Sequence, residues 1–168
     1  QVEHLDPEVH RSRPSFEDLV PIDPAPRLTL EHEGGPISSR MIDLFCPIGF
    51  GTRGLIVAPP KAGKTTLLRD IATSVAINHP QVRIIAVLID ERPEEVTEFT
   101  RHVPGEVLAS SNDMDLETHT DLALFAYARA RRLLEAGEDV LFLVDSLTRL
   151  GRAFNNDRRY ATGGRTMS

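Results

Sequence analysis

The sequence predicts an α/β fold, a mostly parallel sheet with helices on both faces. Two patterns indicate this fold. Short apolar runs alternate along the chain with stretches of helical periodicity, an order that is typical of βαβ units. In addition, Val82 to Ile89 is apolar at every position except Arg83, as expected for a strand that is covered on both faces. The 168 residues are enough for one such domain with its own core.

The first part of the chain is expected to be a connector rather than a domain. Residues 1 to about 26 are rich in proline, acidic residues and arginine and show no sustained period. The alternation from Arg27 to Glu31 predicts a short strand, and Met41 to Phe45 is a second short apolar stretch. We therefore divide the chain into a connector, residues 1–40, and a partial domain, residues 41–168.

The rest of the chain is predicted to alternate between strands and helices. The apolar run from Gly54 to Ala58 is expected to be a strand that leads into a loop. Pro93 suits the first turn of a helix, and Gly137 suits the end of another. Further strands are predicted over 82–89, 107–110 and 140–144, and helices over 65–77, 93–102, 116–136 and 146–154. The polar tail, residues 155–168, adds no closing element, so the domain is expected to be truncated at its C-terminus.

Composition and charge exclude several classes of function. The formal net charge is −6, whereas a domain that binds nucleic acid with its whole surface is usually basic, so any such contact must be local. No apolar run approaches the roughly 20 residues of a membrane span, and we expect no membrane partner. Cys46 is the only cysteine, which excludes an intrachain disulfide and fits a cytoplasmic setting; we expect it to be buried. The six histidines lack metal-ligand spacing and are expected at the surface.

One segment has the pattern of a phosphate-binding loop. Ala58-Pro59-Pro60-Lys61-Ala62-Gly63-Lys64-Thr65 follows a predicted strand and opens a predicted helix, the context that this motif requires. Backbone N–H groups in such a loop surround an anion. Lys64 would reach the β- and γ-phosphates of ATP, and the Thr65 hydroxyl would bind Mg²⁺. Lys61 and Lys64 are the only lysines among 19 basic residues, which suggests that the ammonium group is needed there. Ala58 departs from the usual first glycine, and a chance Gly-Lys-Thr is the alternative.

Acidic residues follow two of the predicted parallel strands. Asp145 ends one strand and could hold Mg²⁺ through water, cap the following helix, or do both. Glu91, within Asp90-Glu91-Arg92 at the end of another strand, is our candidate for the base that orients the attacking water. Arg92 could touch phosphate or relay the nucleotide state to a neighbour. Capping and surface salt bridges are the alternative for this run. Arg149, one turn after Asp145, could face the same crevice or the solvent.

Together these motifs resemble the ATPase domain of the Rho family of bacterial transcription termination factors. Three runs carry the resemblance: Pro47 to Thr65, whose loop also starts with alanine in that family, Leu88 to Val96, and Asp145 to Leu150. The similarity extends from about residue 15 to the end of the chain. It implies a RecA-like P-loop NTPase fold and a homohexameric, ATP-driven RNA translocase that unwinds RNA–DNA hybrids.

The resemblance also implies a role for each matching residue. Glu91 would be the base, Lys64 and Arg92 would also be catalytic, and Thr65 and Asp145 would hold Mg²⁺. A central loop would contact RNA through Gly163, Gly164 and Arg165, with arginine where a lysine is usual. The ATP-binding residues would be Gly49, Phe50, Gly51, Thr52, Arg53, Gly54, Lys61, Ala62, Gly63, Lys64, Thr65, Thr66 and Arg92.

The implied cofactors are ATP and Mg²⁺, and the implied partners are single-stranded RNA, further copies of the chain in a hexamer, and RNA polymerase. The arginine finger that this family donates across the subunit interface would lie downstream. Because such a finger contributes on the order of 10³ to 10⁵ in rate, the fragment alone is expected to be nearly inactive. One alternative is a secretion or rotary-synthase ATPase, which shares Asp-Ser-Leu-Thr-Arg but typically carries Gly-Glu-Arg-Gly-Arg-Glu at residues 90–95. The other is a non-catalytic nucleotide-binding domain, against which the intact loop and carboxylates argue.

Overall fold

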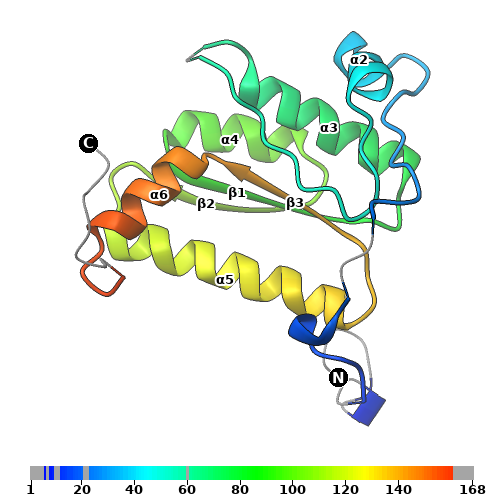
Figure 1. Ribbon diagram of the computed structural model, residues 1–168. Helices are drawn as coiled ribbons and strands as arrows, with labels where there is room; N and C mark the ends of the chain where they lie inside the picture. The colour runs from blue at the N-terminus through cyan, green and yellow to red at the C-terminus, as the bar shows by residue number, and fades with distance from the viewer. Residues whose placement is uncertain (1–5, 7, 10–11, 21–22, 60, 161–168) are drawn as a thin grey trace.

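The fold is a parallel sheet between two layers of helices (Figure 1). The computed structural model describes residues 6, 8–9, 12–20, 23–59 and 61–160. Within these, three strands pair in the order β2-β1-β3, and both pairings are parallel. The strands are β1 (Arg83–Glu91), β2 (Glu106–Ser111) and β3 (Val140–Asp145), and the helices are α2 (Ile37–Phe45), α3 (Lys64–Asn78), α4 (Pro93–His102), α5 (Leu116–Glu135) and α6 (Leu147–Asn156). The predicted α/β class is confirmed, and these strands and the helices α3 to α6 match the predicted ones within about two residues.

The central strand β1 divides the core into two halves. Successive side chains of a strand point to opposite faces, so alternate positions of β1 enter different clusters. Ile84, Ala86 and Leu88 pack with buried residues of α3 and α4, whereas Ile85, Val87 and Ile89 pack against α5. The continuous apolar run in the sequence therefore reflects two separate apolar layers. Figure 1 shows α3 and α4 over one face and α5 over the other.

The predicted strand from Arg27 to Glu31 is wrong. Leu28 and Leu30 are buried, with 5% and 0% exposure, and pack into the α3 side of the core. The segment makes only an isolated antiparallel bridge, between Arg27 and Gly49. Instead of a neighbouring strand, the Asp43 carboxylate accepts the backbone N–H groups of Leu30 and Glu31, at 3.0 and 2.7 Å. The alternation in the sequence reports burial on one side, not strand pairing.

The predicted strand from Gly54 to Ala58 is also absent. Leu55 is 69% exposed and Val57 85% exposed, while Ile56 between them packs against the core. A strand needs a neighbour to satisfy its backbone groups, and β3 pairs with β1 alone among the described residues. The segment is therefore extended but unpaired. The apolar stretch from Met41 to Phe45 belongs to the helix α2, and Cys46 beyond it is exposed rather than buried.

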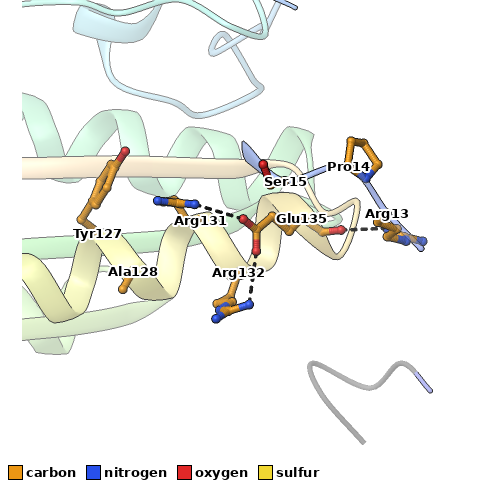
Figure 2. Close-up of a pocket in the computed structure, with 8 residues that line it drawn as sticks. All are labelled: Arg13, Pro14, Ser15, Tyr127, Ala128, Arg131, Arg132 and Glu135. Atoms are coloured by element: carbon orange, nitrogen blue, oxygen red, sulfur yellow. Dashed lines mark hydrogen bonds and ion pairs between the residues drawn. The ribbon is translucent and has the colours of Figure 1, made fainter. Parts of the chain in front are cut away.

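Part of the predicted connector is fixed to the end of α5 by Glu135 (Figure 2). The Glu135 carboxylate accepts the backbone N–H of Phe16 at 3.2 Å, and its backbone carbonyl accepts a long hydrogen bond of 3.5 Å from Arg13. Arg131, one turn earlier on α5, pairs with both Glu17 and Glu135. The short 3₁₀ helix η1 (Phe16–Asp18) is thereby held against α5. The boundary at residue 40 stays a prediction.

Replacing Glu135 by alanine is expected to destabilise the fold. Although burial opposes the effect, the Phe16 N–H and Arg131 hold the pKa of Glu135 below its usual value. The carboxylate therefore contributes stability at neutral pH that is lost as the pH falls through its folded pKa. We expect Glu135→Ala to lower the free energy of unfolding by about 1–3 kcal/mol at pH 7 and by less at pH 3, as measured by urea unfolding.

The matched control is Glu138→Ala, since Glu138 makes an ion pair with the half-exposed Arg83. We expect that change to cost at most about 1 kcal/mol. Equal losses in the two variants would contradict a special role for Glu135.

Candidate nucleotide site

The candidate site lies where the parallel strands β1 and β3 end. In open α/β sheets, ligands bind in the crevice at the carboxyl ends of the strands. Asp145 is the last residue of β3 and is paired in register with Leu88 of β1, and Glu91 is the last residue of β1. The helix α6 starts two residues after Asp145. A hydrogen bond and an ion pair between Asp145 and the first two residues of α3 place the predicted phosphate loop at the same edge.

The start of α3 has the geometry of an anion-binding turn. Gly63 is the N-cap of α3 and has a φ of 87°, which disfavours any residue with a side chain. Lys61, two residues earlier, also has a positive φ of 63°. No side chain caps the helix, so its first N–H groups and its dipole are available to a negatively charged group. These features fit the predicted phosphate loop.

Asp145 joins this loop to the sheet. Its side chain is 1% exposed; Lys64 makes an ion pair with one carboxylate oxygen, and the Thr65 hydroxyl donates to the other at 2.9 Å. A buried carboxylate must be compensated by charge and hydrogen bonds, and both partners come from the first turn of α3. The capping alternative for Asp145 is not supported, because the N-cap of α6 is Ser146, whose hydroxyl accepts the Arg149 N–H.

Glu91 lies in a different electrostatic environment from Asp145. Burial and a hydrogen bond with Glu95 raise the pKa of Glu91, while the guanidinium of Arg149 acts in the opposite direction. The Arg149 Nη1 lies 3.1 Å from a carboxylate oxygen of Glu91, and it also donates to the backbone carbonyl of Asp90. Asp90 has a φ of 57° at a shift in the β1–β2 register. Arg149 therefore faces the crevice, one of the two alternatives left open by the sequence.

Glu95 was missed by the sequence analysis as a neighbour of Glu91. It lies in the first turn of α4, which starts two residues after Glu91 ends β1, and this closeness in sequence could have suggested the contact. Arg92 is the N-cap residue of α4 and is exposed. Its predicted contact with nucleotide stays a prediction.

One of the predicted ATP-binding residues, Phe50, lies away from the phosphate loop. The ring of Phe50 contacts that of His79, at 5.8 Å between centroids, and its N–H bonds to Pro26. His79 follows the last residue of the 15-residue helix α3, so this contact lies about 22 Å from the helix start. Gly49, Gly51, Thr52, Arg53 and Gly54 continue this segment, in which Thr52 bonds to Gly49. The predicted RNA-contacting residues, Gly163, Gly164 and Arg165, lie outside the described residues.

One histidine differs from its predicted surface position. His119 is 4% exposed, and its Nδ1 lies 2.8 Å from the hydroxyl of the buried Ser110 on β2. This contact joins α5 to the strand β2. Within the part of the chain that the structure describes, three or more His, Cys, Asp or Glu side chains nowhere gather as a metal site. None of the helices there combines the length and apolar content needed to cross a bilayer.

Known proteins resemble this chain over most of its length. Over 158 residues it is 55% identical to "Transcription termination factor Rho" of Streptomyces coelicolor, which covers 94% of this chain and 38% of that protein. The protein of the same name from Rhodopirellula baltica is 44% identical, covering 96% of this chain and 32% of the relative. The chain thus spans about two fifths or less of these relatives, and the predicted resemblance to Rho is confirmed.

A solved structure gives an independent comparison. The prototypical ATPase from the type III secretion system of pathogenic bacteria superposes with a TM-score of 0.61 at 28% identity, covering 79% of this chain and 39% of that one. Residues 38–156 match the family described as "ATP synthase alpha/beta family, nucleotide-binding domain". The parallel sheet and the contacts between the phosphate loop and Asp145 agree with this family. The chain belongs to the ATP synthase alpha/beta family, as a RecA-like nucleotide-binding domain.

Proposed function

We propose that this chain is the ATPase part of an ATP-dependent RNA translocase that acts in transcription termination. One observation carries the catalytic half of the proposal: Lys64 and Thr65 of the phosphate loop both contact Asp145 at the end of β3. The identity of 44–55% with proteins named Rho supports the biological half.

Each of these residues has a distinct task in ATP hydrolysis. Lys64 makes an ion pair with Asp145, and its flexible stem can carry the ammonium group to the β- and γ-phosphates. The backbone N–H groups at the start of α3 bind the same phosphates. Glu91, buried at the end of the neighbouring strand, accepts a proton from the attacking water and orients it in line. Arg92 and the segment from Gly51 to Gly54 contribute further contacts with the nucleotide.

The residues present fit Mg²⁺. The Thr65 hydroxyl and the Asp145 carboxylate bring two hard oxygen ligands within 2.9 Å of each other, and Mg²⁺ prefers oxygen ligands, of which the protein supplies one or two beside phosphate and water. The lack of a larger ligand cluster in the described residues is consistent with this use. Thr65 and Asp145 would hold Mg²⁺, which would supply positive charge to offset the negative charge that develops on the phosphates.

The partners follow from the same resemblance. We propose single-stranded RNA as the second substrate, contacted in part by Gly163, Gly164 and Arg165, and a hexamer of identical subunits that acts on transcripts held by RNA polymerase in the cytoplasm. The net charge of −6 requires the RNA contact to be local. A secretion-type motor is the second candidate, favoured by the superposition at a TM-score of 0.61. Its identity of 28% is much lower than that of the Rho proteins.

Replacing Lys64 by alanine in the full-length protein is expected to weaken ATP binding by about 100-fold or more, because it removes a charged contact with the phosphates. Isothermal titration calorimetry would measure the affinity, and circular dichroism would confirm that the fold survives. Arg101→Ala removes an exposed cation from the far end of α4 and should leave binding intact. Unchanged affinity in the Lys64 variant would contradict the assignment.

Replacing Glu91 by glutamine is expected to separate binding from hydrolysis. The amide keeps the size of the side chain but cannot accept the proton, so ATP should still bind while turnover falls by about 100-fold or more. Glu94→Gln, at an exposed position nearby on α4, is the matched control in a phosphate-release assay. If turnover persisted in the Glu91 variant, another residue would be the base.

The full-length protein is expected to hydrolyse ATP faster when single-stranded RNA is added. Turnover measured with and without RNA distinguishes the two candidate functions, with double-stranded RNA of the same length as a control. Rapid hydrolysis that does not respond to RNA would contradict the termination-factor proposal and favour the secretion-type motor.

A further inference from the structure

A buried carboxylate joins the end of α6 to the start of α5. Asp157 follows the last residue of α6, and its side chain is 1% exposed. The hydroxyl of Thr120, a buried residue of α5, donates to Asp157 Oδ2 at 2.7 Å. Figure 1 shows these two helix ends next to each other. The contact brings together two positions that are 37 residues apart in the sequence.

Arg159 supplies the positive charge that this carboxylate needs. Two of its nitrogen atoms contact the two oxygens of Asp157, Nε at 3.1 Å from Oδ1 and Nη2 at 2.8 Å from Oδ2. The backbone N–H of Arg159 also donates to Oδ1, at 2.9 Å. A buried carboxylate must be compensated by charge and hydrogen bonds, and a contact through two nitrogens is the strong form that arginine can make.

The pair stays ionised at neutral pH. The hydrogen bonds from Arg159 hold the pKa of Asp157 well below its usual range, although burial opposes the effect. The same bonds raise the pKa of Arg159. The ion pair is therefore present throughout the pH range in which ATP hydrolysis is measured.

The part of α5 that contacts Asp157 is itself joined to the sheet. His119, the residue before Thr120, has its Nδ1 2.8 Å from the hydroxyl of Ser110 on β2, and both residues are buried. Arg159 adds an ion pair at 3.0 Å with Asp121, the residue after Thr120. The end of α6 is therefore held against a part of the domain that is itself fixed.

Asp157 and Arg159 also determine the course of the chain after α6. The Asp157 carbonyl accepts the N–H of Tyr160 at 3.0 Å, which closes a turn over residues 157–160. The Tyr160 ring lies edge-on to that of Phe154 on α6, at 5.2 Å between centroids, and the Arg159 guanidinium lies 5.5 Å from the centre of the Tyr160 ring. Both ring contacts are attractive. The turn is therefore folded back on α6.

The helix α6 connects this turn to the nucleotide site. It starts two residues after Asp145 and has ten residues, a length of about 15 Å. The residues proposed to contact RNA, Gly163 to Arg165, follow Tyr160 within five positions in the sequence. The turn thus lies between the candidate nucleotide site and the proposed RNA contacts along the chain.

We propose that Asp157 and Arg159 are positioning residues for the stimulation of ATP hydrolysis by RNA: their ion pair fixes the turn after α6 on α5, at the point from which the chain continues to the proposed RNA contacts. The proposal rests on the proposed function, since it applies only if RNA stimulates the ATPase. The pair acts through the turn and contacts neither RNA nor ATP. A segment whose start is already fixed loses less freedom when it binds, so the pair strengthens RNA binding.

Three variants of the full-length protein test the pair. Arg159→Gln removes its positive charge, and Arg159→Lys keeps the charge but loses the contact through two nitrogens. Because Arg159→Gln leaves a buried carboxylate without its cation, the double variant Asp157→Asn with Arg159→Gln removes both charges together. Arg83→Gln is the matched control, since it breaks an arginine–glutamate ion pair at the start of β1, at the opposite edge of the sheet.

Two measurements are needed. Hydrogen–deuterium exchange without RNA or nucleotide reports on the turn, and the amides of Arg159 and Tyr160 should exchange faster in Arg159→Gln and in the double variant. In ATPase assays, the RNA concentration for half-maximal stimulation should rise by about tenfold in both, while the KM for ATP stays within about twofold. Arg159→Lys should show a smaller rise, and Arg83→Gln should change neither measurement.

Unchanged exchange in the double variant would overturn the proposal, because the pair would then not fix the turn. Faster exchange with an unchanged RNA requirement would also overturn it, as would an equal rise in the RNA and ATP requirements, which indicates general disruption of the fold. The failure of the proposed function gives a different result, since the unaltered protein would then hydrolyse ATP without responding to RNA.

Discussion

The candidate site depends on one buried carboxylate. Asp145 ends β3 with 1% of its side chain exposed, and the cost of burying its charge is offset by Lys64 and Thr65. Both partners belong to the first turn of a helix 80 residues earlier in the sequence. Because neither partner is on the sheet, the interaction fixes the start of α3 above the end of β3. The packing of Leu68, Ile71 and Val75 against the strands places α3, and the contacts with Asp145 add a direct link between the phosphate loop and the strand end.

The parts of the fold that the sequence predicted are those in which burial and local geometry agree. In β1, every position from Ile84 to Ile89 is buried in one of two apolar layers, so this stretch is apolar throughout and its assignment to a strand is unambiguous. Pro93 and Gly137 mark a helix start and a helix end at positions that local stereochemistry favours. The segments around Leu28 and Leu55 were wrongly predicted to be strands, because a strand forms only where a neighbouring strand is present to pair with it. Apolar alternation reports which side is buried and says nothing of whether a partner strand is present.

The same distinction applies to the site. The phosphate loop and the acidic strand ends are short local patterns, and the structure places them at one edge of the sheet. The ion pair between Glu91 and Arg149 joins residues 58 positions apart, and only the packing of α6 against the end of β1 brings them together. The opposite holds for Phe50, which precedes the loop closely in sequence but packs beside His79 at the far end of α3. Nearness in sequence did not imply nearness in space.

The two carboxylates at this edge are prepared for different tasks by what surrounds them. Asp145 contacts a cation and a hydroxyl donor, a setting that suits a metal ligand. Glu91 is buried between another carboxyl group and a guanidinium, and burial with Glu95 raises its pKa. A carboxylate whose pKa lies closer to neutrality is the better proton acceptor at physiological pH. Environments that distinguish two neighbouring carboxyl groups in this way support distinct roles for them, and here they support the proposed roles of Asp145 as a metal ligand and Glu91 as the base.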